Sequence, residues 1–263
     1  MIEVSYKFTE KYVYVNEQKI CYLEGGIATN SEPILFLHGW GVGIEPYQEV
    51  LNVLCDRYHL FAPYLPGFGK SSNFIVNFNY HEYANVLIAF LRELNITKVH
   101  LVGHSLGGGI AATIAAEMPH LVETITLVDS TGIPIEPVPL VLIKRAIEMT
   151  AQTPQMRFPQ IIKIFQGFSY NLFFRTQNTI QALLMSLEKD LKLLLPEIKA
   201  PCLLVWGTND LTTPLKAGQE FLQLIKGSKL IVVDGVYHEW SLFHVEKFTN
   251  IVFDFIHSTV TKK

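Results

Sequence analysis

Three features of the sequence predict an α/β domain with a mostly parallel, doubly wound sheet and a helical insertion. Short apolar runs alternate along the chain with segments of helical periodicity, which implies right-handed crossovers and a sheet covered on both faces. The 263 residues, of which 49% are hydrophobic and 17% charged, suit one domain with a large core. A proline-rich link and an aromatic-rich stretch then interrupt the alternation near the middle of the chain.

The first half of the chain supplies most of the predicted sheet. Residues 12–23 are typical of a β-hairpin with Asn16-Glu17-Gln18 at its turn. Continuous apolar runs are typical of parallel strands buried on both faces, and they cover residues 33–37, 59–62, 98–103 and 124–128. Helical periodicity predicts helices near residues 47–58, over residues 81–94 and from Ser105 to about Pro119.

A change of composition marks an insertion in this pattern. The segment Ile133–Pro139 is rich in proline and forms a stiff link out of the sheet. Residues 140–185 have helical character and gather phenylalanine, tyrosine and methionine side chains. We therefore expect a core of residues 1–132 and 186–263 and a helical cap of residues 133–185. After the cap, the sequence predicts a helix to Leu195, a strand at 201–206, a helix at 216–225, a strand at 229–233 and a helix at 243–256.

Composition and patterning exclude several classes of function. The formal net charge of −3 and the lack of basic runs leave no electrostatic footprint for nucleic acid. The N-terminus has no signal-peptide pattern, and no apolar stretch reaches membrane-spanning length. Cys21, Cys55 and Cys202 are widely spaced among apolar neighbours, which indicates buried free thiols rather than a disulfide or metal site. We expect a cytoplasmic protein with no cofactor and no metal, and its oligomeric state stays open.

The strongest functional signal is the run Gly103-His104-Ser105-Leu106-Gly107. A short apolar run precedes this Gly-x-Ser-x-Gly pattern and small, helix-compatible residues follow it, so we predict a strand, a very tight turn and a helix. The residue at the apex of such a turn is strained, and its close neighbours must lack bulky side chains, as Gly103 and Gly107 do. Ser105 would then stand at a helix N-terminus, where free amides favour a developing negative charge. We interpret Ser105 as a nucleophile.

A serine hydroxyl needs a base to attack a carbonyl group at neutral pH, and that base needs an orienting carboxylate. His238 lies between the last predicted strand and the last predicted helix, and Asp210 lies in a turn just past a strand. Residues at the carboxyl ends of parallel strands meet at one edge of the sheet, where ligands bind. We predict His238 as the base, Asp210 as the orienting acid, and the backbone amides of Trp40 and Leu106 as oxyanion donors.

Each of these assignments has an alternative in the sequence. Asp129 also ends a predicted strand, so it is the alternative acid. We favour a structural role for Asp129, in which its carboxylate caps the turn into the insertion through the Ser130 or Thr131 amides. His244 is the alternative base, but it falls within the pattern of the last helix.

Five motifs together resemble the α/β-hydrolase superfamily over nearly the whole chain. They are His38-Gly39-Trp40, Pro66-Gly67-Phe68-Gly69-Lys70-Ser71, Gly103-His104-Ser105-Leu106-Gly107-Gly108, Trp206-Gly207-Thr208-Asn209-Asp210 and Gly235-Val236-Tyr237-His238. The resemblance implies the α/β-hydrolase fold and a triad in the chain order serine, aspartate, histidine. Tyr64 departs from the family pattern, which commonly has a structural acidic residue at that place. A serine nucleophile also argues against epoxide hydrolases and haloalkane dehalogenases, whose nucleophile is a carboxylate.

These observations predict a serine hydrolase, carboxylesterase-like, that cleaves a small carboxylic ester or related acyl compound through an acyl-enzyme. The aromatic residues of the expected cap suggest a small-molecule substrate with an apolar group. The candidate pocket residues are His38, His104, Phe168, Phe173 and Trp240.

Two other functions stay open. One is hydrolysis of a carbon–carbon bond in a vinylogous diketone, as in the similar meta-cleavage-product hydrolases, with Arg157 or Arg175 as a clamp for a carboxylate. Those enzymes tend to have asparagine where His104 stands. The other is a ligand receptor that keeps the triad but signals through its cap, as some plant hormone receptors of the superfamily do.

Overall fold

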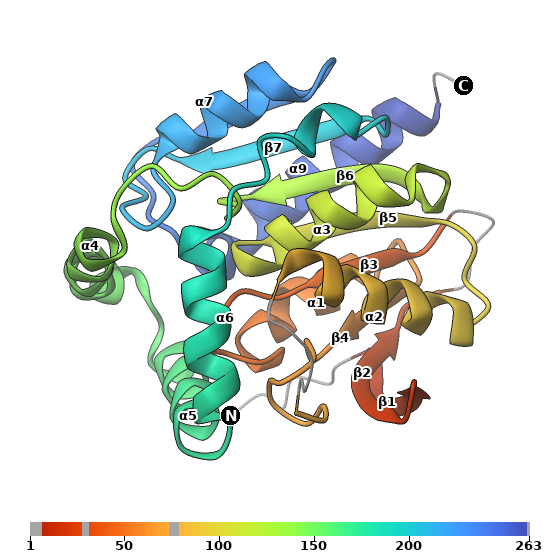
Figure 1. Cartoon of the computed structure of the whole chain (residues 1–263), viewed down its shortest axis with the longest axis horizontal. Coiled ribbons are helices and arrows are strands. Elements are labelled where there is room, and N and C mark those ends of the chain that lie inside the picture. The colour runs from red at the N-terminus through yellow and green to blue at the C-terminus, as the bar shows by residue number, and fades with distance from the viewer. Residues whose placement is uncertain (1–6, 28–31, 74–78, 262–263) are drawn as a thin grey trace.

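The computed structural model describes residues 7–27, 32–73 and 79–261 of the chain. Within these ranges the strands form one eight-stranded sheet in the order β1-β2-β4-β3-β5-β6-β7-β8. Figure 1 shows this sheet in the middle of the molecule with helices on both faces. The strands are β1 (Phe8–Val15), β2 (Gln18–Gly25), β3 (Ile34–Leu37), β4 (Leu60–Pro63), β5 (Val99–His104), β6 (Val122–Val128), β7 (Cys202–Gly207) and β8 (Lys229–Val233).

The pairing pattern confirms the predicted, mostly parallel sheet. Strands β3 to β8 pair in parallel, whereas β2 pairs antiparallel with β1 and β4. Asn16 and Glu17 join β1 to β2, and both have the positive φ (46° and 67°) that a two-residue hairpin turn requires. The hairpin is longer than predicted, because its pairing extends from Val15 opposite Gln18 out to Phe8 opposite Gly25.

Helices on the two faces of the sheet enclose two apolar cores. One core packs against α2 (Tyr80–Glu93), α3 (Leu106–Glu117) and α7 (Leu215–Leu224), and the other against α1 (Gln48–Leu54) and α9 (Val245–Val260). Strand side chains alternate between them: Leu35 and Leu37 enter the first core, and Ile34 and Phe36 enter the second. Short 3₁₀ turns occur at η1 (Glu45–Tyr47), η2 (Pro119–Leu121), η3 (Thr153–Gln155) and η4 (Leu195–Glu197).

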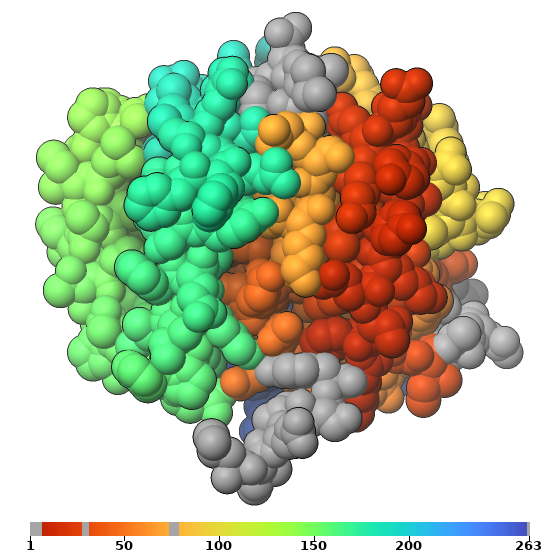
Figure 2. Space-filling model, turned by 90° about the horizontal axis from the view of Figure 1, so that it is seen from below, coloured from red at the N-terminus to blue at the C-terminus, as the bar shows by residue number. Residues whose placement is uncertain are grey.

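The chain between β6 and β7 forms α4 (Val138–Gln152), α5 (Phe158–Phe174) and α6 (Thr176–Glu188). These helices lie beyond the carboxyl ends of the parallel strands, on the left of Figure 1. Figure 2 shows them from below, along one flank of the molecule. Pro139 falls in the first turn of α4, where its missing N–H removes no helical hydrogen bond. On the core side, Trp40 Nε1 donates to the Thr179 carbonyl (2.7 Å) and the Gly69 amide donates to Asn171 Oδ1 (2.9 Å).

Two helix boundaries differ from the expectation. The helix predicted to reach Leu195 ends at Glu188, and residues 189–194 are not helical. Asp190 Oδ1 accepts a hydrogen bond from the Lys192 amide (2.7 Å), and such local bonds compete with helix formation. The last predicted helix, at 243–256, corresponds to α9, which begins at Val245 and continues to Val260, and the short α8 (Trp240–Phe243) precedes it.

The three cysteines are buried free thiols, as predicted. Burial raises the pKa of the Cys55 thiol to about 11, so this side chain stays protonated near neutral pH. In the described part of the chain, no helix combines the length and the apolar character needed to cross a membrane.

Gly107 is required where α3 approaches β3. A Cβ atom on Gly107 would lie 2.2 Å from the Leu37 carbonyl oxygen, and neither backbone can move freely at this position. We expect Gly107→Ala to lower the free energy of unfolding by about 1–3 kcal/mol, the usual cost of overpacking. Chemical denaturation of the purified variants measures this loss.

Gly167→Ala in α5 is the matched control. Its new Cβ would lie 3.5 Å from the nearest atom, an ordinary contact, and alanine favours a helix over glycine by up to about 1 kcal/mol. Stability should therefore stay equal or increase in this control. A similar loss in both variants would show that close packing at Gly107 is not the cause.

Candidate active site

Ser105 lies at the apex of the turn between β5 and α3, as predicted. Its φ of 53° and ψ of −119° fall in a region that residues with a side chain rarely adopt. The turn is so tight that a Cβ atom on Gly103 would lie 2.4 Å from the Gly107 carbonyl oxygen. Ser105 precedes the first residue of α3, where the amides lack intrahelical acceptors. The prediction that Gly103 and Gly107 are close neighbours of a strained Ser105 is therefore confirmed.

Hydrogen bonds join Ser105, His238 and Asp210 in one chain. Ser105 Oγ lies 2.9 Å from His238 Nε2, and His238 Nδ1 lies 2.8 Å from Asp210 Oδ2. An ionised carboxylate only accepts hydrogen bonds, so Nδ1 donates to Asp210 and Nε2 is left to accept the Ser105 hydroxyl proton. All three side chains are buried. The structure thus brings together the three residues that the sequence analysis selected.

Opposing effects set the pKa of His238. Burial alone would lower the pKa of its imidazole, but the negative charge of Asp210 and the hydrogen bond to it raise the pKa above its ordinary value. Asp210 is fixed in turn, because its Oδ1 accepts the amides of Thr212 (2.8 Å) and Thr213 (2.7 Å). These bonds leave Oδ2 facing His238.

Asp129 has a structural environment that differs from the expected one. Its Oδ1 accepts the Gly207 amide (2.9 Å) and its Oδ2 accepts the Trp240 indole N–H (2.7 Å), instead of the Ser130 or Thr131 amides. The φ of Asp129 is 43°, and this conformation directs the carboxyl group across to β7 and the start of α8. Burial and the nearby charge of Asp210 raise the pKa of Asp129 well above its ordinary value.

His104 supports the loop that carries His238. Its Nε2 lies 3.0 Å from the His238 carbonyl oxygen, which can only accept, so Nε2 donates and Nδ1 accepts the Tyr47 hydroxyl (2.7 Å). The Tyr47 oxygen accepts the Gly39 amide in turn (3.0 Å). Burial, reinforced by His238, lowers the pKa of His104 to about 4, so this ring stays neutral.

A carboxylate from α4, Glu148, connects the two loops that carry His238 and Asp210. Glu148 Oε1 accepts the amides of His238 and Leu211, both at 3.0 Å, and Oε2 accepts the Thr212 hydroxyl (2.6 Å). The Glu148 side chain is completely buried. The sequence analysis did not single out this residue, although a signal exists. Arg145, Glu148 and Gln152 follow Val141 at helical spacing and thus place polar groups on the inner face of α4.

The remaining charges near the site are paired with each other. Arg145 forms a two-pronged ion pair with Glu239 and also contacts Glu148 (3.2 Å). Gln152 Nε2 donates a further hydrogen bond to Glu239. Burial alone would raise the pKa of Glu239, but Arg145 dominates and lowers it to about 2. The ion pair thus fixes the residue that directly follows His238.

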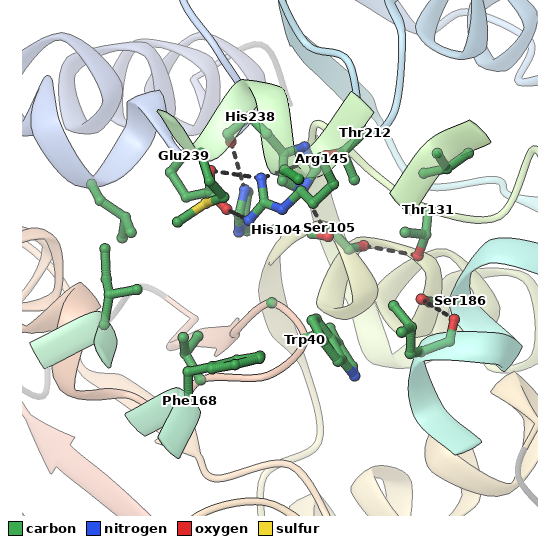
Figure 3. A pocket seen from close by; sticks show the side chains of 18 of the residues that line it. Trp40, His104, Ser105, Thr131, Arg145, Phe168, Ser186, Thr212, His238 and Glu239 are labelled. Carbon is green, nitrogen blue, oxygen red and sulfur yellow. Dashed lines mark hydrogen bonds and ion pairs between the residues drawn. The ribbon is translucent and has the colours of Figure 1, made fainter. Parts of the chain in front are cut away.

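A cavity of about 470 Å³ opens in front of Ser105 and His238. Figure 3 shows the polar side chains gathered around Ser105, with Trp40 and Phe168 across the cavity from them. The rings of Trp40 and Phe168 meet edge to face, with centroids 5.7 Å apart. The apolar lining from the insertion comprises Val141, Leu142, Ala146, Met149, Met156, Ile161, Ile164, Phe165, Phe168 and Leu183, and Leu187 near the end of α6 adds to it.

Only part of the predicted pocket lines this cavity. His104 and Phe168 do, whereas His38, Phe173 and Trp240 do not. Phe173 is 76% exposed on the outer side of α5. His38 is buried below the site, where its Nε2 accepts the Leu65 amide (2.9 Å), and burial lowers its pKa to about 4. Trp240 is buried against Asp129, as described above.

The predicted oxyanion donors flank Ser105. Leu106 is the first residue of α3, so its amide has no acceptor within the helix. The loop that carries Trp40 runs beside Ser105, since a Cβ atom on Gly39 would lie 3.4 Å from Ser105 Cβ. Gly39, Trp40 and Ser105 all line the cavity.

Comparisons with known proteins agree with this architecture. The family model of the α/β hydrolase fold matches residues 32–142. The chain is 26% identical to 2-hydroxy-6-oxo-6-phenylhexa-2,4-dienoate hydrolase of Burkholderia cepacia, over 97% of this chain and 99% of that protein. A membrane phospholipase A superposes with a TM-score of 0.82 and 25% identity over 96% of this chain and 87% of that one. The enol-lactonase of Burkholderia xenovorans LB400 superposes with a TM-score of 0.79 and 20% identity, over 94% and 100% of the two chains, which shows the shared fold.

The fold and these similarities define the class of protein, which is a hydrolase. The chain has the α/β-hydrolase fold, which the family model and the solved structures share.

Glu148→Ala tests the connection between α4 and the two loops. The variant leaves the buried amides of His238 and Leu211 without an acceptor. Each unsatisfied amide lowers the free energy of unfolding by about 1–3 kcal/mol. We expect the free energy of unfolding to fall by about 2–5 kcal/mol and amide hydrogen exchange to accelerate at both positions.

Glu188→Ala, at the exposed end of α6, is the matched control and should change stability by less than about 0.5 kcal/mol. Glu148→Gln retains one carbonyl acceptor and should recover part of the lost stability. Unchanged exchange at His238 and Leu211 in Glu148→Ala would contradict the proposed connection.

Proposed function

We propose that the protein is a serine hydrolase that cleaves a neutral carboxylic ester with an apolar group. The observation that carries this proposal is the chain of short contacts from Asp210 through His238 to Ser105. It matches the arrangement by which a carboxylate and an imidazole activate a serine hydroxyl.

In the proposed mechanism, Ser105 Oγ attacks the ester carbonyl carbon while His238 Nε2 takes the hydroxyl proton. Asp210 stabilises the imidazolium that forms. The tetrahedral intermediate then expels the alcohol, which receives the proton from His238, and Ser105 is left acylated. A water molecule repeats the attack on the acyl group and releases the carboxylic acid and free Ser105.

The negative charge that develops on the carbonyl oxygen needs donors next to Ser105. We assign this role to the backbone amides of Leu106 and Trp40, whose positions beside Ser105 support it. Backbone donors suit the task, because they are already oriented and need no reorganisation during the reaction.

The charge distribution of the cavity favours a neutral substrate. Arg145 is its one lysine or arginine lining residue among those described, and two carboxylates already surround it. Arg157 and Arg175, considered as carboxylate clamps, lie outside the lining. Arg157 forms an ion pair with Glu49, and Arg175 donates to Asn73 and Ser71.

Hydrolysis of a carbon–carbon bond is the second candidate function. It is supported by the relative from Burkholderia cepacia, named as a dienoate hydrolase, which matches over nearly the full length. A dienoate carries a carboxylate, and the paired state of Arg145 disfavours such a substrate in this cavity. We therefore rank ester hydrolysis first.

We further propose that residues 133–185 act as a cap that selects the substrate. Their helices supply most of the apolar lining, which supports this division. The core, residues 1–132 and 186–263, supplies Ser105, Asp210 and His238.

Replacement of the nucleophile tests the proposed function. Ser105→Ala should lower kcat for a short, water-soluble p-nitrophenyl ester by at least about 10⁴-fold, because the remaining groups cannot form an acyl-enzyme. Covalent labelling by a fluorophosphonate should stop in the same variant. Ser186→Ala, which removes another serine of the cavity lining, should leave labelling intact. Persistent labelling of Ser105→Ala would reject the assignment.

A comparison of Asp210→Asn with Asp129→Asn tests the acid. Asp210→Asn should lower kcat by about 10⁴-fold, the cost of this change in a serine protease. Asp129→Asn should mainly lower stability, by about 1–2 kcal/mol, because the asparagine NH₂ group would face one of the two donors, Gly207 or Trp240, and cannot accept from it. An inactive but folded Asp129→Asn beside an active Asp210→Asn would reverse the assignment.

The pH dependence of activity is a second test of the pair formed by His238 and Asp210. Only neutral His238 can act as a base, so activity falls as the pH drops through its pKa. Because Asp210 raises this pKa, the acid limb of kcat/KM should lie above the ordinary imidazole value of about 6.5. The residual activity of Asp210→Asn should show this limb at lower pH.

A further inference from the structure

We propose that the insertion docks on a lipid surface through an apolar rim around the cavity mouth, so that the ester enters from the lipid phase. The rim comprises Leu142, Ile143 and Ile147 on α4 and Phe158, Ile162 and Phe165 on α5. This inference rests on the proposed function and extends it, since it assigns the ester to the class of lipids.

The position of the mouth follows from the exposure of the lining residues. Most of the lining is buried or half-buried, and its exposed members are Leu142, Ala146, Thr153 and Phe165. Phe165 is 69% exposed although it lines the cavity. All four residues belong to α4, α5 or the turn between these helices, so the cavity opens between α4 and α5.

The outer surface beside this mouth is apolar over two helices. Phe158, Ile162 and Phe165 follow one another at the i, i+4, i+7 spacing of a helical stripe, and Ile143 and Ile147 lie one turn apart on α4. An apolar stripe of this kind normally faces a core. Here its side chains face outward, and Phe158 is 73% exposed. Exposed apolar side chains gathered beside a cavity mouth indicate an interaction site.

The charges of these helices point to apolar rather than ionic attraction. Lys144, Arg145 and Arg157 each form an ion pair with a carboxylate of the same molecule, namely Glu136, Glu239 and Glu49. Their positive charge is therefore largely compensated, and the further lysine of these helices, Lys163, donates to Gln48 Oε1 (3.0 Å). We expect the rim to bind an uncharged or zwitterionic lipid surface with little dependence on salt.

A lipid surface explains the rim better than a second copy of this chain does. A second copy seated on α4 and α5 would cover the mouth between them and block the cavity. A lipid surface covers the same apolar side chains and also delivers an apolar ester to the mouth. The long acyl group of such an ester would contact the apolar side chains that α4 and α5 contribute to the lining.

Vesicle binding tests the rim independently of catalysis. Ser105→Ala protein, which cannot consume lipid, is sedimented with phosphatidylcholine vesicles at low and high salt. Phe158→Glu and Ile147→Glu, made in this background, alter rim residues that do not line the cavity. Each should weaken partitioning by about tenfold or more, because an apolar side chain that would be buried in the lipid is replaced by a charge.

Leu193→Glu is the matched control, since Leu193 is 97% exposed and lies outside the insertion helices. It should bind vesicles like its Ser105→Ala parent. The inference is overturned if the parent does not bind, if the control loses as much binding as the rim variants, or if the rim instead mediates a dimer that Phe158→Glu dissociates in size-exclusion chromatography.

The two proposals fail in different ways. With Ser105 present, Phe158→Glu should hydrolyse a short, water-soluble ester as fast as the wild type. Intact turnover together with absent vesicle binding rejects only the lipid surface. Absent turnover of that ester by the wild type rejects the proposed function.

Discussion

The unusual backbone conformation of Ser105 is the constraint on which the rest of the site depends. A positive φ at a residue with a side chain costs about 1–3 kcal/mol, and the surroundings must supply that energy. The Ser105 amide donates to the Val128 carbonyl on β6 (3.0 Å), and the Ser105 carbonyl accepts both the amide and the hydroxyl of Thr131 (each 3.1 Å). Bonds to the end of β6 and to Thr131 just after it thus fix the turn, and Ser105 Oγ lies within hydrogen-bond distance of His238.

The partners of Ser105 depend on contacts from outside the sheet. His238 and Asp210 lie in separate loops, and the carboxylate that joins these loops comes from α4. The position of α4 therefore helps to set the position of the base, His238. The partly buried pair of Arg145 and Glu239 adds a second contact between the same elements. Removal of one charge from such a pair leaves the other buried and uncompensated, so both are needed together.

The parts that the sequence predicted correctly are those that depend on local patterns. Apolar runs, Gly-x-Ser-x-Gly and the turn at Asp210 each report on a few consecutive residues, and they located the strands and the three bonded side chains. The pocket could not be predicted in this way. Phe173 and Phe168 belong to the same aromatic run, and only the rotation of α5 places one in solvent and the other in the cavity. The bonds of Asp129 to Gly207 and Trp240 join residues far apart in the chain, so no local signal identified them.

The two ends of the insertion meet where the chain leaves and rejoins the sheet. The Leu191 amide donates to the Gly132 carbonyl (2.7 Å), and β6 and β7 are neighbouring parallel strands. A segment whose ends are already joined behaves as a closed loop, and the entropy of closing a loop increases only slowly with its length. Apart from α4, whose Glu148 joins the loops of His238 and Asp210, helices can therefore be lengthened, lost or exchanged in this segment at little thermodynamic cost to the sheet. Specificity can thus diverge between related chains while the strained turn and its hydrogen-bonded partners stay the same.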